Sequence, residues 1–324
     1  MEPLLFTTSR YAYFEPHLVA AARFERGSVT RKEFPDGERY LRLDSDSWGR
    51  DVVLLGGTPN DLDWLEVYDL GCGIARAGAR SLSILMPYFG YATMERAVKP
   101  GEIVTAKNRA RLISSIPTCE AGTRIYLFDL HTDGIEFYFG DDHVTHHLYG
   151  APAITAAIRS VLGDAPFVLG ATDAGRAKWV ESLARSLSVD PAFVYKRRDA
   201  SSGAVAVTGV NADVRGMDVV LYDDMIRTGS SLIQAAEAYR AAGAGRIFAV
   251  ASHLVLPPGS LERLRATGLF AGILGTNSHP SSQQLAAETL PGGQPAVFDV
   301  SGLFARALER SALDIHGLAA GGRA

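Results

Sequence analysis

The sequence predicts an α/β protein with two tandem domains, each built around a mainly parallel sheet. Short apolar runs recur along the chain, and longer amphipathic segments lie between them. Runs such as Val52–Leu55 and Val219–Tyr222 are apolar throughout, which is typical of strands covered on both faces of a parallel sheet. A chain of 324 residues, 47% of them hydrophobic, is long enough for about two domains with cores of their own.

The predicted strands are short and bounded by polar or turn-forming residues. In chain order they are Leu4–Thr7, Val52–Leu55, Ser81–Met86, Arg124–Phe128, Phe167–Gly170, Ala192–Tyr195, Val219–Tyr222, Ile247–Ala251, Ala271–Leu274 and Ala296–Val300.

The predicted helices carry apolar residues at intervals of three or four positions. In residues 229–242, Leu232, Ala236 and Tyr239 share one stripe, and Gly243 follows as a stop signal. The predicted helices are Asp61–Ala77, Thr105–Ile116, Gly150–Leu162, Arg176–Leu187, Gly229–Ala242 and Ser260–Thr267.

The alternation of strands and helices becomes less regular near Asp141–Tyr149, and we expect the domain boundary there. The predicted domains are therefore residues 1–148 and 149–300. The segment Pro291–Pro295 predicts a loop, because prolines flank two glycines.

Charge and composition exclude several classes of protein. The 32 basic and 36 acidic residues give a net charge of −4, which excludes a nucleic-acid coat that works by bulk charge. The two cysteines, Cys72 and Cys119, have no metal-ligand spacing and form no disulfide framework. Because no leader and no apolar run of about 20 residues is evident, we expect a soluble, cytoplasmic protein without nucleic-acid or membrane partners.

The strongest local motif follows the apolar run Val219–Tyr222. Asp223 and Asp224 end the run, and the turn Arg227–Ser231 then opens a predicted helix. The amides and hydroxyls of this turn can bind a phosphate at the helix N-terminus. The two acids can accept hydrogen bonds from the vicinal hydroxyls of a sugar or bind a metal. The plainer alternative is a strand end followed by an ordinary Ser/Thr helix cap.

The motif resembles the phosphoribosyl-diphosphate loop of type I phosphoribosyltransferases. Further segments, in the same order along the chain, resemble the markers of the ribose-phosphate pyrophosphokinase family. They are Phe34–Glu38 (FxDGE), Pro87–Ala92 (PYxGYA), Thr105–Lys107 (SAK), Asp129–His131 (DLH), Lys196–Arg198 (KRR), Ser252–His253 and Thr276–Ser278.

The resemblance implies two tandem phosphoribosyltransferase-like domains, with the C-terminal helix 301–316 packed back on the first. It also implies Mg²⁺-dependent transfer of the diphosphoryl group of ATP to the C1 hydroxyl of ribose 5-phosphate, with release of AMP. The ribose phosphate would be held by Asp223, Asp224, Arg227, Thr228, Gly229, Ser230 and Ser231.

The remaining roles are also implied by the resemblance. His131 and Asp173 would serve the metal and the substrate hydroxyls, while Lys196 and Arg198 would stabilise charge on the transferring phosphates. Arg96 would contribute to the nucleotide site, and Phe34, Asp36 and Glu38 would reach the adenine of a neighbouring subunit in a homo-oligomer, a dimer or a hexamer.

Each segment also has a plainer interpretation. His131 could cap a strand end, Lys196–Arg198 could be a solvated basic patch, and Phe34–Glu38 is a good hairpin turn on propensity alone. The group His143, His146 and His147 lacks a completing ligand, so we expect surface or interface histidines rather than a metal site. Trp64, Tyr68 and Leu70 are expected in packing.

Three residues depart from the family pattern. Thr93 and Met94 stand where the family usually has the arginine and glutamine of YARQDR. Loss of such an arginine removes a charge-assisted contact to the nucleotide, typically worth ~1.5–3 kcal/mol. Arg227 stands where the loop usually has aspartate, so the charge beside the sugar is reversed.

The sequence is compatible with several functions. The first is a ribose-phosphate pyrophosphokinase. The alternatives are a diphosphotransferase with another ribose-phosphate acceptor, a phosphoribosyltransferase, and a non-catalytic regulatory homologue. Arg227 would either contact the diphosphate or Mg-nucleotide, or select a more anionic acceptor, or point to solvent.

Overall fold

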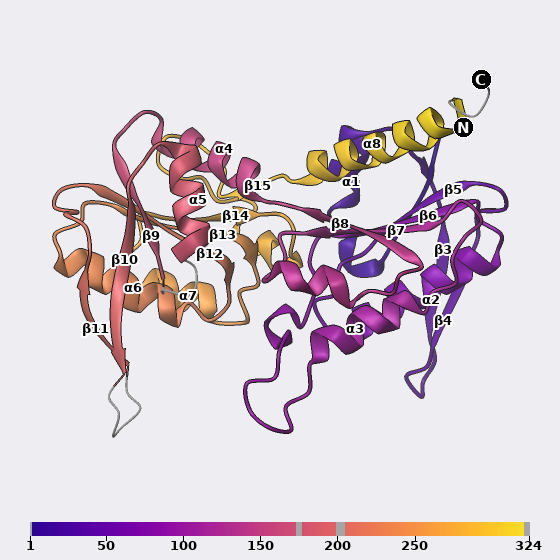
Figure 1. Cartoon of the computed structure of the whole chain (residues 1–324), viewed down its shortest axis with the longest axis horizontal. Helices are drawn as coiled ribbons and strands as arrows, with labels where there is room; N and C mark the ends of the chain where they lie inside the picture. The colour runs from indigo at the N-terminus through magenta and orange to yellow at the C-terminus, as the bar shows by residue number, and fades with distance from the viewer. Residues whose placement is uncertain (1, 173–176, 199–204, 321–324) are drawn as a thin grey trace. The chain divides into compact units, whose positions relative to one another are not determined.

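The computed structural model describes residues 2–172, 177–198 and 205–320. The chain divides into two compact units, one formed by Met1–Tyr149 with Val300–Ala324 and the other by Gly150–Asp299. Each unit contains its own sheet with helices packed against it (Figure 1). The predicted α/β class with two mainly parallel sheets is confirmed.

The sheet of the first unit has six strands, and every neighbouring pair is parallel. Its inner strands are almost wholly buried because helices cover the apolar side chains. In spatial order the strands are β2 (Glu25–Arg26), β1 (Leu4–Thr7), β5 (Asp51–Leu55), β6 (Ser81–Met86), β7 (Thr123–Phe128) and β8 (His143–Leu148).

Strand β8 corrects one prediction, because it occupies the region near Asp141–Tyr149 that we expected to be irregular. The strand has one neighbour, β7, and most of its residues are only partly buried. An edge strand of this kind tolerates His and Thr, so it lacks the continuous apolar run by which the other strands were predicted.

Among its described residues, the first unit has the α-helices α1 (Glu15–Ala21), α2 (Asp61–Arg76), α3 (Thr105–Ser114) and α8 (Ser301–Ala320). Helix α2 begins after Asn60, whose side chain accepts hydrogen bonds from the backbone N–H groups of Leu62 and Asp63 at 3.0 and 3.1 Å. The C-terminal helix α8 packs on α1 and β8. The buried ring of Phe304 lies 6.1 Å from that of Phe14, measured between centroids.

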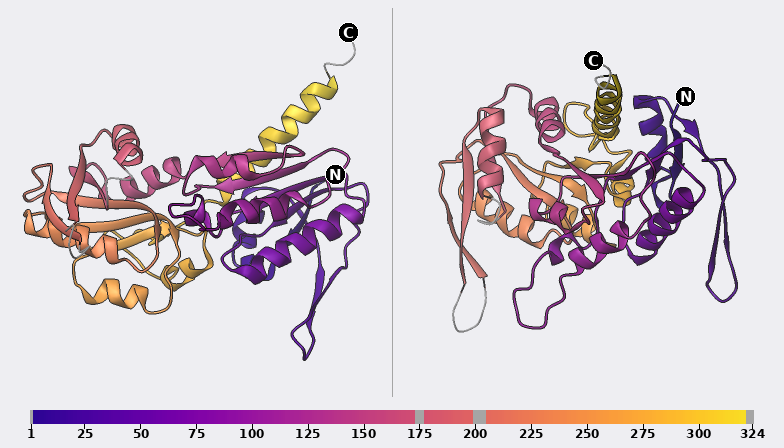
Figure 2. Two further views of the ribbon diagram at one scale, coloured as in Figure 1. Left: turned by 60° about the horizontal axis from the view of Figure 1, so that its bottom comes forward. Right: turned by 45° about the vertical axis from the view of Figure 1, so that its right-hand side comes forward.

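A two-stranded antiparallel hairpin projects from the first unit in both views of Figure 2. It consists of β3 (Val29–Glu33) and β4 (Arg39–Leu43), joined by the predicted turn at Phe34–Glu38. The turn is closed by a 2.9 Å hydrogen bond from the N–H of Phe34 to the carbonyl of Glu38, and Gly37 adopts a φ of 88°. A left-handed φ of this kind favours glycine.

The sheet of the second unit has seven strands, all parallel except for the pair β10–β11. In spatial order they are β11 (Val205–Val210), β10 (Pro191–Arg198), β9 (Phe167–Ala171), β12 (Asp218–Ile226), β13 (Ile247–Leu254), β14 (Gly272–Thr276) and β15 (Val297–Phe298). The helices are α4 (Ala151–Leu162), α5 (Ala177–Leu187), α6 (Ser230–Ala241) and α7 (Ser260–Ala266).

The predicted strands and helices are all present, with ends that differ by a few residues. Strand β12 differs most from its predicted bounds. It continues from Tyr222 through Asp223 and Asp224 to Ile226. The predicted packing of Trp64 and Leu70 is also confirmed, since both are buried in the first core and Tyr68 packs against it. No helix among the described residues is long and apolar enough to cross a bilayer.

Candidate active site

The turn 227–231 after β12 is the candidate anion-binding loop, because it opens a helix whose first N–H groups can bind an anion. The strand ends at Ile226, and α6 begins at Ser230 directly after Gly229. Gly229 has a φ of 74°, and a Cβ atom there would lie 2.5 Å from the Leu264 side chain. Only glycine meets both demands, so the motif's central residue is required by the backbone and by packing.

The two acids of the motif lie at the carboxyl end of β12. Asp224 is 4% exposed, and its N–H group donates to Asp223 Oδ1 at 2.9 Å. The buried hydroxyl of Thr172 donates to Asp223 Oδ2 at 3.0 Å. Thr172 follows β9, the strand beside β12, so the fold orients the Asp223 carboxylate from a neighbouring strand end.

The hydroxyl and cationic side chains of the turn are exposed. Thr228 Oγ1 and Ser230 Oγ lie 3.3 Å apart, and Ser231 and Arg227 are also exposed. Arg263 from α7 joins them: its Nη2 donates to the carbonyl oxygen of Thr228 and, at 2.9 Å, to Ser230 Oγ. The structure therefore brings together the sequence-predicted residues 223–231 and adds two that sequence analysis missed, Thr172 and Arg263.

His131 lies in the first unit, just beyond the carboxyl end of β7, and is partly exposed. The turn before it is strained, because buried Asp129 has a φ of 45°. The N–H group of Leu130 donates to Nε2 of His147 at 2.9 Å. Desolvation lowers the pKa of His147, although the nearby carboxylates Asp129 and Asp133 oppose this shift. His147 is therefore suited to accept this hydrogen bond in its neutral form.

The histidines of β8 are buried or half-buried, so the prediction of surface groups is wrong for His143, while the interface alternative stays a prediction. His143 is buried and its pKa is lowered by desolvation. His146 stacks on Tyr126 with ring centroids 4.8 Å apart, and only 4% of the His147 side chain is exposed. Within the described ranges, no group of three or more His, Cys, Asp and Glu side chains could hold a metal ion.

The predicted nucleotide residues lie on separate segments of the first unit. Phe34, Asp36 and Glu38 are exposed at the tip of the hairpin. Arg96 is exposed and pairs with Glu95 at 3.3 Å. It follows the short helix η2 (Ala92–Met94), which contains the departures Thr93 and Met94.

A polar cluster that sequence analysis missed precedes η2. The Tyr91 hydroxyl donates to Asp61 Oδ1 at 2.7 Å, and Nη2 of Arg109 donates to the same oxygen at 2.6 Å. The Arg109 guanidinium also lies over the Tyr91 ring, 5.0 Å from its centroid. Tyr91 has a φ of 63°, so these contacts hold a left-handed residue at the start of η2.

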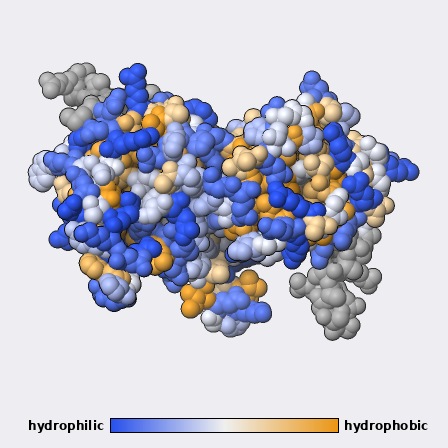
Figure 3. Space-filling model, turned by 180° about the vertical axis from the view of Figure 1, so that it is seen from behind, coloured by the Kyte–Doolittle hydropathy of each residue, from blue (hydrophilic) through white to orange (hydrophobic). Residues whose placement is uncertain are grey.

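The loop after η2 exposes large apolar side chains. Val98 is 73% exposed and Ile103 is 72% exposed. Figure 3 shows hydrophobic surface on this projecting loop. The Glu102 carboxylate supports the loop, since it accepts hydrogen bonds from the N–H groups of Val98 and Lys99 at 2.6 and 3.0 Å.

Three predicted residues are described only in part or not at all. The backbone of Lys196 and Arg198 lies in β10 and pairs with Val207 and Val205 of β11, but their side chains lie outside the described part of the structure. Asp173 lies outside the described residues.

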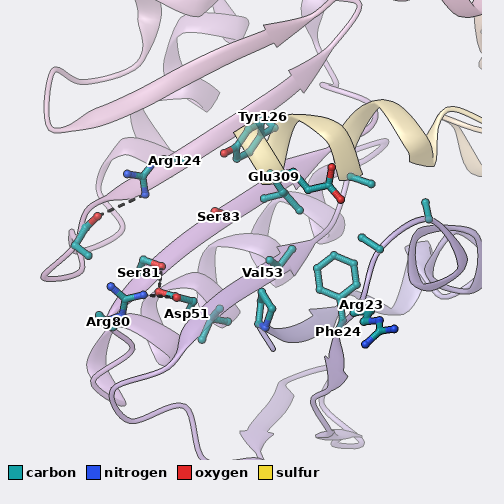
Figure 4. Close-up of a pocket in the computed structure, with 17 residues that line it drawn as sticks. Arg23, Phe24, Asp51, Val53, Arg80, Ser81, Ser83, Arg124, Tyr126 and Glu309 are labelled. Atoms are coloured by element: carbon teal, nitrogen blue, oxygen red, sulfur yellow. Dashed lines mark hydrogen bonds and ion pairs between the residues drawn. The ribbon is translucent and has the colours of Figure 1, made fainter. Parts of the chain in front are cut away.

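A cavity of about 540 Å³ lies near the amino ends of the strands of the first sheet (Figure 4). Asp51 and Ser81, at the amino ends of β5 and β6, line it together with Tyr126 and Leu308. Ser81 Oγ donates to Asp51 Oδ1 at 2.6 Å, and Arg80 also pairs with Asp51. Because His131 follows the carboxyl end of the sheet, this cavity is separate from it.

Two family models match the chain. The model for the N-terminal domain of ribose phosphate pyrophosphokinase matches residues 4–116, and the model for the phosphoribosyl transferase domain matches residues 148–265. The second match contains the whole candidate anion-binding loop, and the first contains the hairpin.

Individual relatives agree with these models. A ribose-phosphate pyrophosphokinase of Synechococcus elongatus is 31% identical over 282 residues, which cover 86% of this chain and 83% of the relative. One from Prochlorococcus marinus subsp. pastoris is 34% identical over 259 residues, covering 79% and 76%. The crystal structure of phosphoribosylpyrophosphate synthetase from Mycobacterium smegmatis is 26% identical and covers 97% of this chain and 100% of its own, with a TM-score of 0.83.

The fold and the loop define a protein with the type I phosphoribosyltransferase architecture in two α/β units. With both family models and relatives above 30% identity over most of its length, the chain belongs to the ribose-phosphate pyrophosphokinase family.

Proposed function

We propose that the protein transfers the β,γ-diphosphoryl group of ATP to the C1 hydroxyl of ribose 5-phosphate. The hydroxyl oxygen forms a bond to the β-phosphorus, the bond from that phosphorus to the oxygen bridging to the α-phosphate breaks, and AMP leaves. The hydroxyl proton is released. The observation that carries the proposal is the loop Thr228–Ser231, which follows Asp224 and Asp223, and both carboxylate oxygens of Asp223 accept hydrogen bonds.

The described residues have distinct roles in this proposal. The exposed hydroxyls of Thr228, Ser230 and Ser231 and the N-terminus of α6 hold the 5-phosphate. Asp223 and Asp224 accept hydrogen bonds from the ribose hydroxyls. Arg227 rims the same pocket. This division matches the chemistry of a phosphate monoester with an adjacent diol.

Phosphoryl transfer also needs a cation, and a carboxylate such as that of an aspartate is the kind of ligand that magnesium takes. Mg²⁺ is usually held by one or two carboxylates together with substrate phosphates and water, so a three-residue protein cluster is not required. Asp173 and His131 are the residues we assign to the metal. Bound Mg²⁺ would neutralise charge on the phosphates.

The remaining assignments concern the nucleotide. Lys196 and Arg198 alternate on β10 and stabilise charge on the transferring group. Arg96 contributes to the ATP site. Phe34, Asp36 and Glu38, exposed on a projecting hairpin, reach the adenine bound to a second subunit. The active form is therefore a homo-oligomer, a dimer or a hexamer.

A direct assay tests the proposal. The purified full-length chain is incubated with Mg-ATP and ribose 5-phosphate, and AMP and phosphoribosyl diphosphate are measured by mass spectrometry. Formation of both products in equal amounts is expected. AMP without the diphosphorylated sugar, or neither product, would contradict it.

One observation favours a second acceptor. Arg227 is exposed on the loop, so its positive charge lies beside the proposed sugar-phosphate site. A ribose phosphate with a larger, more anionic substituent would gain from that charge. A panel of ribose phosphates assayed beside ribose 5-phosphate distinguishes the two acceptors by their kcat/KM.

A further inference from the structure

Arg263 joins helix α7 to the anion-binding loop. Its Nη2 donates to the carbonyl oxygen of Thr228 and to Ser230 Oγ, the residues on either side of Gly229. The next residue of the helix, Leu264, is buried and lies where a Cβ atom on Gly229 would be. Two successive residues of α7 therefore contact the turn, one through polar atoms and one through packing.

The guanidinium of Arg263 is held at the loop and keeps N–H groups that have no hydrogen-bond partner among the described residues. Arginine has five N–H donors, and only Nη2 of Arg263 has a hydrogen-bond partner among the described residues. No carboxylate pairs with Arg263 in the described ranges, and its side chain is exposed. Its charge is thus not neutralised by the protein at the position where the loop presents its hydroxyls.

Arg265 provides a contrast on the same helix. Its Nη2 pairs with Glu288, so its charge is neutralised within the protein. The two arginines are both exposed and close in sequence, but only Arg263 contacts the loop. This difference separates a surface ion pair from a cation directed at a binding site.

We propose that Arg263 is a further substrate-binding residue, which donates charge-assisted hydrogen bonds to the phosphate group seated in the loop. The ligand class is a phosphate monoester dianion. Arginine suits this role because its planar guanidinium can bond to phosphate oxygens while Nη2 holds the loop. The proposal rests on the proposed function in its choice of ribose 5-phosphate, but its binding test needs no turnover.

Calorimetry of the full-length chain measures the binding of ribose 5-phosphate and of inorganic phosphate in the absence of ATP. Arg263→Gln is expected to weaken both affinities about tenfold or more, and Arg263→Lys is expected to weaken them less. Arg265→Gln, the matched control, is expected to keep wild-type affinity. If the enzyme turns over, Arg263→Gln should raise KM for the sugar phosphate and leave KM for ATP within about twofold.

Wild-type affinity in Arg263→Gln, an equal loss in Arg265→Gln, or no binding of either probe by the wild-type chain would overturn the proposal. Circular dichroism and thermal melting of each variant must match the wild type. If a variant is misfolded, Arg263→Lys supplies the comparison instead. One outcome would separate the two proposals. If the wild-type chain binds phosphate but makes no phosphoribosyl diphosphate, and Arg263→Gln loses phosphate binding, this inference is supported and the proposed function is refuted.

Discussion

The Thr172 hydroxyl donates a hydrogen bond to Asp223 Oδ2 at 3.0 Å, across the junction between the ends of β9 and β12. The other oxygen of Asp223 accepts from the N–H group of Asp224 at 2.9 Å. Both carboxylate oxygens are thus oriented before a substrate arrives. In the proposed mechanism Thr172 is a positioning residue, because it acts through Asp223.

Thr172→Val removes this hydroxyl at nearly constant volume. A hydrogen bond to a charged group is worth ~1.5–3 kcal/mol, so we expect kcat/KM for the sugar phosphate to fall by roughly 10- to 100-fold. Thr172→Ser keeps the donor and should retain most of the activity. Steady-state kinetics with each variant measures this. Equal losses in the Val and Ser variants would show that packing matters and that the hydroxyl does not.

Lys196→Ala is expected to lower kcat by roughly 100-fold or more and to change KM for the sugar phosphate little. A cation directed at developing charge acts mainly in the transition state. Arg197 is the matched control, since successive positions of an extended strand alternate between its two faces, and Arg197→Ala should keep kcat within a few-fold. A loss confined to KM for the sugar would rule out a catalytic role for Lys196.

Arg227→Asp tests which acceptor the loop prefers. One charge contact at ~4 Å with an effective dielectric near ~20 is worth about 4 kcal/mol before desolvation, and a quarter of that changes a preference about fivefold. We expect the kcat/KM ratio of larger anionic ribose phosphates to ribose 5-phosphate to fall about fivefold, and the effect to shrink at physiological salt. An unchanged ratio together with an unchanged KM for ATP would mean that Arg227 selects nothing.

From the exposed hairpin we expect that the protein forms an oligomer and that this oligomer is needed for activity. Phe34 is 47% exposed at its tip, although a large aromatic side chain gains by being covered. Multi-angle light scattering should give a dimer or a larger even-numbered assembly. Phe34→Ala should raise KM for ATP more than KM for the sugar phosphate. A fully active monomer at the assay concentration would exclude a shared nucleotide site.

Much of the fold could be predicted because its central strands are buried on both faces and are therefore apolar throughout. The same reasoning missed β8, whose histidines and threonine occupy an edge position. It also missed β3 and β4 as strands, because a projecting hairpin can carry charged residues such as Arg31 and Arg42. Only the turn between them has a sequence signal, in Pro35 and Gly37.

The candidate site divides in the same way. Residues 223–231 could be predicted because they are contiguous and follow one strand. Thr172 and Arg263 could not, since they lie 51 and 33 residues from the partners they contact. Thr172 reaches Asp223 only because β9 lies beside β12, and that strand order has no local sequence signal.

From the burial and the hydrogen bond of His147, we expect acid to destabilise the turn before His131. Its Nε2 accepts the N–H of Leu130 at 2.9 Å, and a protonated imidazole has no lone pair for this bond. Desolvation lowers the pKa of His147 in the folded state, although the nearby carboxylates of Asp129, Asp133 and Glu136 raise it in part. The unfolded chain therefore binds a proton first as pH falls. The stabilisation is complete above the ordinary histidine value of about 6.5 and is lost below it, toward the folded pKa.

The free energy of unfolding, measured by urea titration between about pH 7.5 and 5, should fall with pH in the wild-type chain. In His147→Gln the amide oxygen can still accept from Leu130 but does not titrate, so the slope should be smaller. The buried His143, whose pKa is also lowered by desolvation, supplies part of the remaining slope, and a double variant with His143→Gln should flatten it further. A His147→Gln slope equal to that of the wild type would show that His147 titrates alike in the folded and unfolded states, and that its burial does not couple this turn to pH.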